Sequence, residues 1–206
     1  MAIHRLNHAV LYVRDVTTST AFYRDVLGFR VTALMGGQAV FLQAPDSTND
    51  HDLALFGLGE RAGDSTAGRS TVGMYHLAWE LGTLAELEDH LHRLEVAGAL
   101  SGSSDHGTSK SLYAKDPDGL QFEVVWIVPA ALLDDAAVEA SSRVGRLDLE
   151  REKSHYGADT RGGVGVGIPA WPRARKGVRP GARTRGGCGR RRWSCRSSGR
   201  PDGGSG

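Results

Sequence analysis

The order of sequence elements occurs twice, and this duplication is the feature that most limits what the chain can fold into. Each half opens with an apolar strand pattern containing a histidine, and the two histidines, His8 and His76, stand 68 residues apart. A helix follows in each half, then three further strands in the first half and two or three in the second, although little identity survives between the halves. The pattern predicts an α+β fold built from two similar units.

Hydrophobic periodicity and turn residues locate the elements of each unit. The first unit is expected to contain strands over 3–14, 29–35, 38–44 and 51–57, with a short helix that follows Asp15 and ends at Gly28. The second is expected to contain strands over 74–81, 110–115 and 120–127, with a leucine-striped helix over 83–97. Both faces of the 3–14 strand are apolar, so we expect both to be covered. Residues 58–72 have no periodicity and are interpreted as a linker or mobile loop.

The C-terminal part changes character twice. Residues 129–142 are rich in alanine and 146–156 resemble a short helix, so a helical extension is expected over 129–170; the sequence does not decide whether it packs on the sheets. The last 36 residues, 171–206, hold 11 Lys and Arg but one acid and no Leu, Ile, Phe or Met. Such a segment cannot offset its chain entropy by burying apolar surface, so we expect a disordered tail.

Charge and cysteine placement exclude several functions. The net charge of +1 combines 14 basic and 23 acidic residues over 1–170 with a tail of net charge +10. The composition of the tail is also what a GC-rich gene gives in a shifted frame, so we expect an inert tail and no nucleic-acid partner. Both cysteines, Cys188 and Cys195, lie in the tail, which excludes thiol chemistry from the folded part. Without a signal or membrane-span pattern, a cytoplasmic protein with no membrane partner is expected.

Strand alternation gathers three metal-ligand types on one surface. Helices should cover the apolar strand faces, which leaves His8, His76 and Glu123 pointing into a shared concavity. An ionised glutamate among apolar neighbours is costly unless it is paired or binds a metal. Two imidazoles and one carboxylate suit non-haem Fe(II), with positions left open for O₂ and a substrate. The alternative is two ordinary sheet histidines and a salt-bridged glutamate at the rim.

Several segments resemble the vicinal oxygen chelate superfamily, which contains glyoxalases, bleomycin-resistance proteins and type I extradiol dioxygenases. The resemblance covers about residues 3–128, and its motifs are not specific to one activity. The matching segments are His8–Asp15, Ser19–Phe29, His76–Glu80, Asp105–Gly107, Leu112–Tyr113 and Asp116–Glu123. The resemblance implies a domain over 1–128 made of paired βαβββ modules, about 3–58 and 73–128, that form a cup-shaped mixed sheet. It also implies His8, His76 and Glu123 as the metal ligands.

The ligand set favours the extradiol branch of the superfamily. Similar glyoxalase I enzymes add a fourth ligand, usually Glu, from the strand that is 51–56 here; this strand has no Glu, although Asp52 could substitute. The resemblance therefore implies Fe(II), with Mn(II) or another divalent metal as alternatives. It implies a small catechol-like aromatic and O₂ as substrates.

Extradiol enzymes also carry a histidine on the strand that holds His51 here, and a tyrosine ten residues before the ligand glutamate. Tyr113 stands ten residues before Glu123, and His106 matches a second pocket histidine of similar single-ring dioxygenases. The resemblance implies that His51 or His106 is the acid/base, because histidine can take and give a proton near neutral pH. Tyr113 would donate a hydrogen bond to the bound diol.

Two other functions fit the same cup. A glyoxalase-like lyase or isomerase would use a divalent metal there, and a bleomycin-resistance-like protein would sequester a ligand without turnover. The sequence leaves open whether the cup closes within one chain or across a homodimer.

Overall fold

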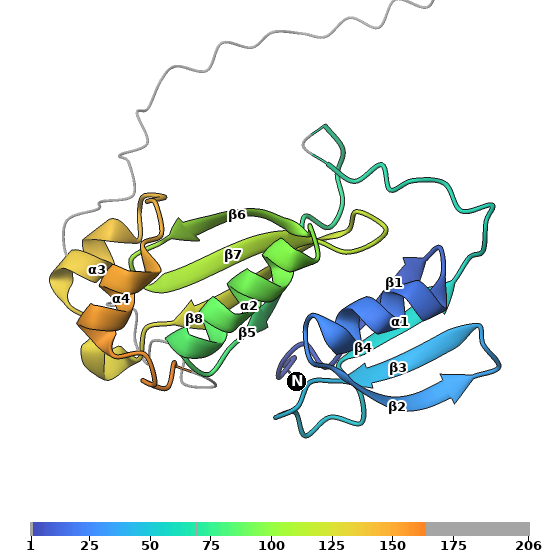
Figure 1. Ribbon diagram of the computed structural model, residues 1–206, viewed down its shortest axis with the longest axis horizontal. Helices are drawn as coiled ribbons and strands as arrows, with labels where there is room; N and C mark the ends of the chain where they lie inside the picture. The colour runs from blue at the N-terminus through green and yellow to red at the C-terminus, as the bar shows by residue number, and fades with distance from the viewer. Residues whose placement is uncertain (1, 69, 164–206) are drawn as a thin grey trace, which may run out of the picture. The chain divides into compact units, whose positions relative to one another are not determined.

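The computed structural model describes residues 2–68 and 70–163, which contain two four-stranded sheets and the helices that accompany them (Figure 1). The predicted tail, with both cysteines, lies outside the described residues. Within the described ranges, no helix is both long and apolar enough to cross a bilayer.

The first sheet has one parallel strand pair in an otherwise antiparallel arrangement. Its strand order is β1-β4-β3-β2, and β1 runs parallel to β4. The helix of this unit starts at Asp15, whose carboxylate caps the N–H of Thr18 at 2.7 Å. The elements are β1 (Ala9–Val13), α1 (Val16–Asp25), β2 (Arg30–Met35), β3 (Ala39–Gln43) and β4 (Leu53–Gly57).

The second sheet repeats this topology, which confirms the predicted paired βαβββ arrangement. Its order is β5-β8-β7-β6, with β5 parallel to β8 and the other pairs antiparallel. In both units the helix lies across one face of its own sheet (Figure 1). The elements are β5 (Leu77–Glu80), α2 (Leu84–Val96), β6 (Leu100–Asp105), β7 (Ser109–Lys115) and β8 (Gln121–Ile127).

The leucine stripe and capping signals of α2 explain why this helix was predictable. Thr83 and Glu86 form a capping box, in which each side chain accepts a hydrogen bond from the backbone of the other. Leu84, Leu87 and Leu94 are fully buried against the second sheet. The helix therefore covers the apolar face of the sheet and leaves the opposite face to polar side chains.

The opening strands are shorter than predicted. β1 begins pairing only where Ala9 meets Leu53 on β4, so His8 immediately precedes the strand, as His76 precedes β5. The expectation that both faces of this strand are covered is wrong for the described residues. Val10 and Tyr12 are 54% and 70% exposed, because α1 covers only the opposite face.

The extension that follows β8 packs on the second unit. It forms a 3₁₀ turn (Ala130–Leu132), α3 (Asp135–Ala140) and α4 (Leu149–Tyr156), gathered at one end of the second sheet (Figure 1). The backbone N–H of Ala85 donates to the carbonyl of Ala158 at 3.0 Å, and the Trp126 indole N–H donates to the carbonyl of Thr160 at 3.2 Å. The helices predicted from the sequence thus form part of the folded unit.

A buried hydrogen bond joins the two units. The Tyr23 hydroxyl on α1 donates to Asp116 Oδ2 at 3.1 Å, and Asp116 Oδ1 accepts from the backbone N–H groups of Asp118 and Leu120. Burial, followed by the nearby Asp116 carboxylate, raises the pKa of Tyr23, and burial raises the pKa of Asp116. Each group therefore depends on the other for a polar partner where water is excluded.

Tyr23→Phe should lower the free energy of unfolding by about 1–3 kcal/mol, because it leaves a buried carboxylate oxygen without its donor. Urea unfolding followed by tryptophan fluorescence would measure the change. Tyr75→Phe removes a hydroxyl from a ring that is 60% exposed and should change stability by no more than about 0.5 kcal/mol. Equal losses in the two variants would show that the buried hydrogen bond contributes nothing specific.

Candidate metal centre and catalytic residues

His76 and Glu123 come together on the second sheet. Glu123 lies on β8 opposite Ala78 of β5, and His76 is two residues before Ala78, so both side chains leave the same face. Their closest atoms, His76 Nε2 and Glu123 Oε2, are 3.0 Å apart, and the two side chains are 26% and 13% exposed. A histidine and a carboxylate are therefore paired at a partly enclosed surface.

The pair fits a metal ion as well as it fits an ion pair. His76 Nδ1 is buried and has no hydrogen-bond partner among the described residues. Two ligand atoms about 2.1 Å from one metal ion and about 90° apart would lie about 3.0 Å from each other. The observed N···O separation is thus compatible with two neighbouring positions in a coordination shell, and nitrogen and carboxylate oxygen are donors that iron, manganese and zinc accept.

A second polar group adjoins this pair. Tyr113 on β7 is the register partner of Glu123, and its ring centroid lies 6.0 Å from that of His76. His106 Nε2 is 2.9 Å from the Tyr113 hydroxyl and 2.8 Å from the Ser104 hydroxyl. Ser104 is buried, and its hydroxyl also donates to the Tyr113 oxygen at 3.3 Å. The group can pass or hold a proton beside the carboxylate.

Ser104 was missed by the sequence reasoning. It lies at the end of β6, a strand that the sequence patterns did not locate. The signal was available, because Ser104 stands two residues before His106 and alternation places such residues on one face.

The other two predicted residues form a separate group on the first sheet. The ring centroids of His8 and His51 are 4.5 Å apart, and the ring of Phe41 lies 5.1 Å from that of His51. His51 Nδ1 is 3.0 Å from Asp50 Oδ2, and this hydrogen bond lowers the pKa of Asp50. The structure therefore brings His8 to His51.

The six predicted residues thus divide between the two sheets. Within residues 2–68 and 70–163, no three His, Cys, Asp or Glu side chains gather closely enough to hold a metal ion. His8 therefore does not join the His76–Glu123 pair within the chain.

The contacts that α1 and the segment after it make with the second sheet explain this separation. Phe22 on α1 packs edge-on against Phe122, with ring centroids 5.9 Å apart. Phe29 packs in the same way against Trp79, at 5.0 Å. Phe122 precedes Glu123, and Trp79 has the opposite strand parity to His76, so both aromatic residues lie on the face away from the candidate ligands. The first unit therefore contacts the wrong face of the second sheet for His8 to reach that pair.

Asp52, the residue that could have replaced a fourth glyoxalase ligand, is engaged elsewhere. Its Oδ2 accepts from the backbone N–H of Ala44 at 2.9 Å. Its Oδ1 accepts from the Ser47 hydroxyl and from the Asn49 amide, each at 2.7 Å. The carboxylate stabilises the loop between β3 and β4, and its use as a metal ligand would break these bonds.

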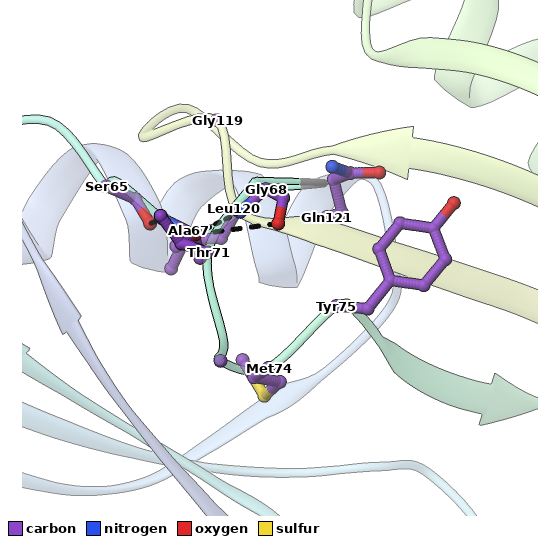
Figure 2. Close-up of a pocket in the computed structure, with 10 residues that line it drawn as sticks. Ser65, Ala67, Gly68, Thr71, Met74, Tyr75, Gly119, Leu120 and Gln121 are labelled. Atoms are coloured by element: carbon purple, nitrogen blue, oxygen red, sulfur yellow. Dashed lines mark hydrogen bonds between the residues drawn. The ribbon is translucent and has the colours of Figure 1, made fainter.

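A cavity of about 540 Å³ opens next to the His76 end of the second sheet. Ala67 and Thr71 of the loop, Leu120 just before β8, and Met74 and Tyr75 before β5 line it (Figure 2). The Tyr75 ring is 4.7 Å from that of His76 by centroid. The lining is largely apolar, and the volume is in the range of pockets that take small organic ligands.

Comparison with known proteins identifies the family. Residues 5–124 match the model of the Glyoxalase/Bleomycin resistance protein/Dioxygenase superfamily. The match covers more than half of the chain, and the chain belongs to this superfamily, as the sequence motifs predicted.

Two similar proteins are named as dioxygenases. The chain is 34% identical over 120 residues to catechol-2,3-dioxygenase of Bacillus subtilis (strain 168), over 58% of this chain and 40% of that protein. It is 34% identical over 126 residues to biphenyl-2,3-diol 1,2-dioxygenase 3 of Rhodococcus globerulus, over 58% of this chain and 62% of that protein. The matches thus span less than two thirds of the length of either relative.

Among solved structures, lactoylglutathione lyase from Agrobacterium tumefaciens is similar at 25% identity and a TM-score of 0.46. The match covers 61% of this chain and 95% of that one.

Proposed function

We propose that the protein is an extradiol-type dioxygenase that uses Fe(II) and O₂ to cleave a small catechol-like aromatic. The observation that carries the proposal is the His76–Glu123 pair, 3.0 Å apart, next to the Tyr113–His106–Ser104 group. The two relatives named as dioxygenases of catechol and of biphenyl-2,3-diol support this choice within the superfamily.

His76, Glu123 and His8 are the proposed ligands, with Mn(II) or another divalent metal as alternatives to Fe(II). Bound Fe(II) would supply a centre at which both catechol oxygens and O₂ can meet. His76 Nε2 and the Glu123 carboxylate, which face each other at 3.0 Å, supply donors on one side of such a centre. His8 is the donor that the single chain leaves on the other sheet.

We propose that His8 completes the metal centre of a second copy of the chain. Phe22 and Phe29 hold the first unit on the helix-covered face of the second sheet, so the His76–Glu123 face is open to a partner. In a symmetric dimer, the first sheet of each copy could cover that face of the other. The exposed side chains of Val10 and Tyr12 surround the proposed contact, and burying them would remove apolar surface from water.

Tyr113 and His106 are the proposed groups that handle protons. The Tyr113 hydroxyl donates a hydrogen bond to a substrate oxygen, and His106 holds a proton at Nε2 or releases it there. The buried Ser104 hydroxyl keeps this nitrogen oriented. His51 would enter the same cup with His8 from the partner copy, where it is the alternative acid/base.

The cavity beside Tyr75 is the proposed place for the aromatic ring. Met74, Tyr75 and Leu120 offer apolar and aromatic contacts, and Gln121 lies on the Glu123 face of β8. A single ring of catechol size fits a cavity of about 540 Å³ with room for ring substituents.

The engagement of Asp52 weighs against the glyoxalase-like alternative, because the fourth ligand of that site would have to leave three hydrogen bonds. The ligand-sequestering alternative requires neither a metal nor Tyr113 and His106. Metal content and turnover therefore separate the three functions.

Anaerobically purified protein loaded with Fe(II) should convert one or more of a panel of catechols to a yellow ring-cleavage product in air. The rate is measured by visible absorbance with O₂ uptake recorded in parallel. Bound nickel or zinc with lyase or isomerase activity would instead favour the glyoxalase-like function. An iron-loaded protein inactive on the whole panel would contradict the dioxygenase proposal.

His8→Ala, His76→Ala and Glu123→Ala should each lose most of the bound iron, since each removes one of three proposed donors. Inductively coupled plasma analysis after gel filtration gives the metal content. His92→Ala, which removes an imidazole from the exposed surface of α2, is the matched control and should keep the wild-type content. A variant of the triad that retains full iron would take that residue out of the ligand set.

Mixing inactive variants tests the shared site. Co-expressed His8→Ala and Glu123→Ala chains should recover about a quarter of wild-type activity, because half of the dimers are mixed and each mixed dimer has one intact site. Co-expressed His76→Ala and Glu123→Ala chains lack an intact site in any pairing and should stay inactive. No recovery in the first mixture, with mixed dimers verified by two affinity tags, would place the whole site within one chain.

A further inference from the structure

The turn that carries His106 is covered by the C-terminal extension. This turn joins β6 to β7, and Ala137, Ala140 and Ser141 of the extension lie against its backbone at Gly107. The superfamily match ends at residue 124, so the extension lies outside the matched residues. An element outside the matched residues thus contacts the segment that presents a proposed catalytic side chain.

The closest contact is at Gly107. Its φ of +71° is in the region that side chains other than glycine rarely adopt. A Cβ at this position would overlap the carbonyl oxygen of Ala137 and lie 2.9 Å from the Cβ of Ala140. Helix α3 is therefore seated directly on the backbone of the residue that follows His106, with no room for a methyl group.

Buried charges hold the turn from its other end. Lys110 is 2% exposed, and its Nζ contacts Asp105 Oδ1 at 2.6 Å and Glu152 Oε2 at 2.9 Å. The same Asp105 oxygen accepts from the backbone N–H of Gly107 at 2.8 Å. Removing one member of such a cluster leaves a buried charge without its partner. Glu152, on α4, therefore helps to fix both ends of the turn.

Backbone bonds complete the attachment. Asp105 exchanges two hydrogen bonds with Gly145, of 3.0 and 2.8 Å, as an added strand pair. These bonds and the ionic cluster hold the main chain on both sides of His106. The side chain of His106 extends to Ser104 and Tyr113. The extension is thus fastened to the turn without contacting Nε2 of His106.

We infer that the extension positions His106 for catalysis, and that Gly107 and Glu152 are positioning residues that act through it. The inference rests on the proposed function, which gives His106 its task. A displacement of about 1 Å at a reacting group can cost about a hundredfold in rate, so the fit of α3 and α4 against the turn controls turnover. The rival explanation is that the extension only stabilises the fold.

Gly107→Ala tests the steric contact. It should lower kcat at least about tenfold, with KM and bound iron changed by less than about twofold, because the turn must move away from α3. Gly98→Ala is the matched control: its φ of +62° imposes the same backbone strain, but a Cβ there meets no atom within 4 Å. This control should lose stability and keep kcat.

Glu152→Gln tests the ionic contact without adding bulk. It removes the carboxylate from Lys110 and should lower kcat in the same way as Gly107→Ala. Glu88→Gln is its control. Glu88 lies on α2, away from the turn, and pairs at 2.6 Å with Lys153, which is on α4 like Glu152. A loss of kcat that is equal in Glu88→Gln, at matched stability, would favour the rival explanation and overturn the inference.

A spectroscopic measurement keeps the test independent of activity. In protein labelled with ¹⁵N-histidine, the His106 Nε2 resonance is identified by its absence in His106→Gln. It should shift in Gly107→Ala and Glu152→Gln and stay in place in the two controls. An unshifted resonance in both folded variants would overturn the inference. If the wild type cleaves no catechol, the proposed function fails, and this resonance alone still decides whether the extension positions His106.

Discussion

The packing of α1 on the helix-covered face of the second sheet is the contact on which the arrangement of the candidate site depends. Phe22 on α1 contacts Phe122, Phe29 just after the helix contacts Trp79, and the Tyr23–Asp116 hydrogen bond fixes the same helix. Since alternate strand residues face opposite ways, apolar packing at Phe122 directs Glu123 to the other face. The burial of Phe122 and Trp79 against the first unit therefore determines which faces of the two sheets can form a shared site.

Much of the fold could be predicted because local signals agreed with the global one. The leucine stripe and the terminator Gly98 indicated α2, and hydrophobic alternation indicated most strands; the capping box at Thr83 that the structure shows agrees with them. Strand parity had put His76 and Glu123 on one face, where they lie 3.0 Å apart; the resemblance had put His106 and Tyr113 in one pocket without indicating the hydrogen bond between them. These features depend on neighbours within one sheet, where alternation and register are strong constraints.

What could not be predicted depends on contacts between separate elements. β6 has the sequence Leu-Ser-Gly-Ser-Ser-Asp, which carries little β-propensity, and it forms because β7 offers a pairing edge. The docking of the extension depends on Lys110, whose burial is evident only once Glu152 is beside it. The separation of His8 from the other proposed ligands likewise follows from the packing of α1, and the sequence motifs do not indicate which sheet face this helix contacts.

The division of side chains between the sheets has a consequence for how such a site can work. The first sheet contributes His8 and His51; the carboxylate beside them, Asp50, is hydrogen-bonded to His51, and Asp52 is used by its own loop. The second contributes Glu123 with a single imidazole, His76. In the proposed dimer neither half would bind a metal tightly alone. Metal binding would therefore stabilise the dimer, and dimer formation would raise the affinity for the metal. The extension would then fix the position of His106 in one half of the cup, and the partner chain would supply His8 to complete the metal coordination.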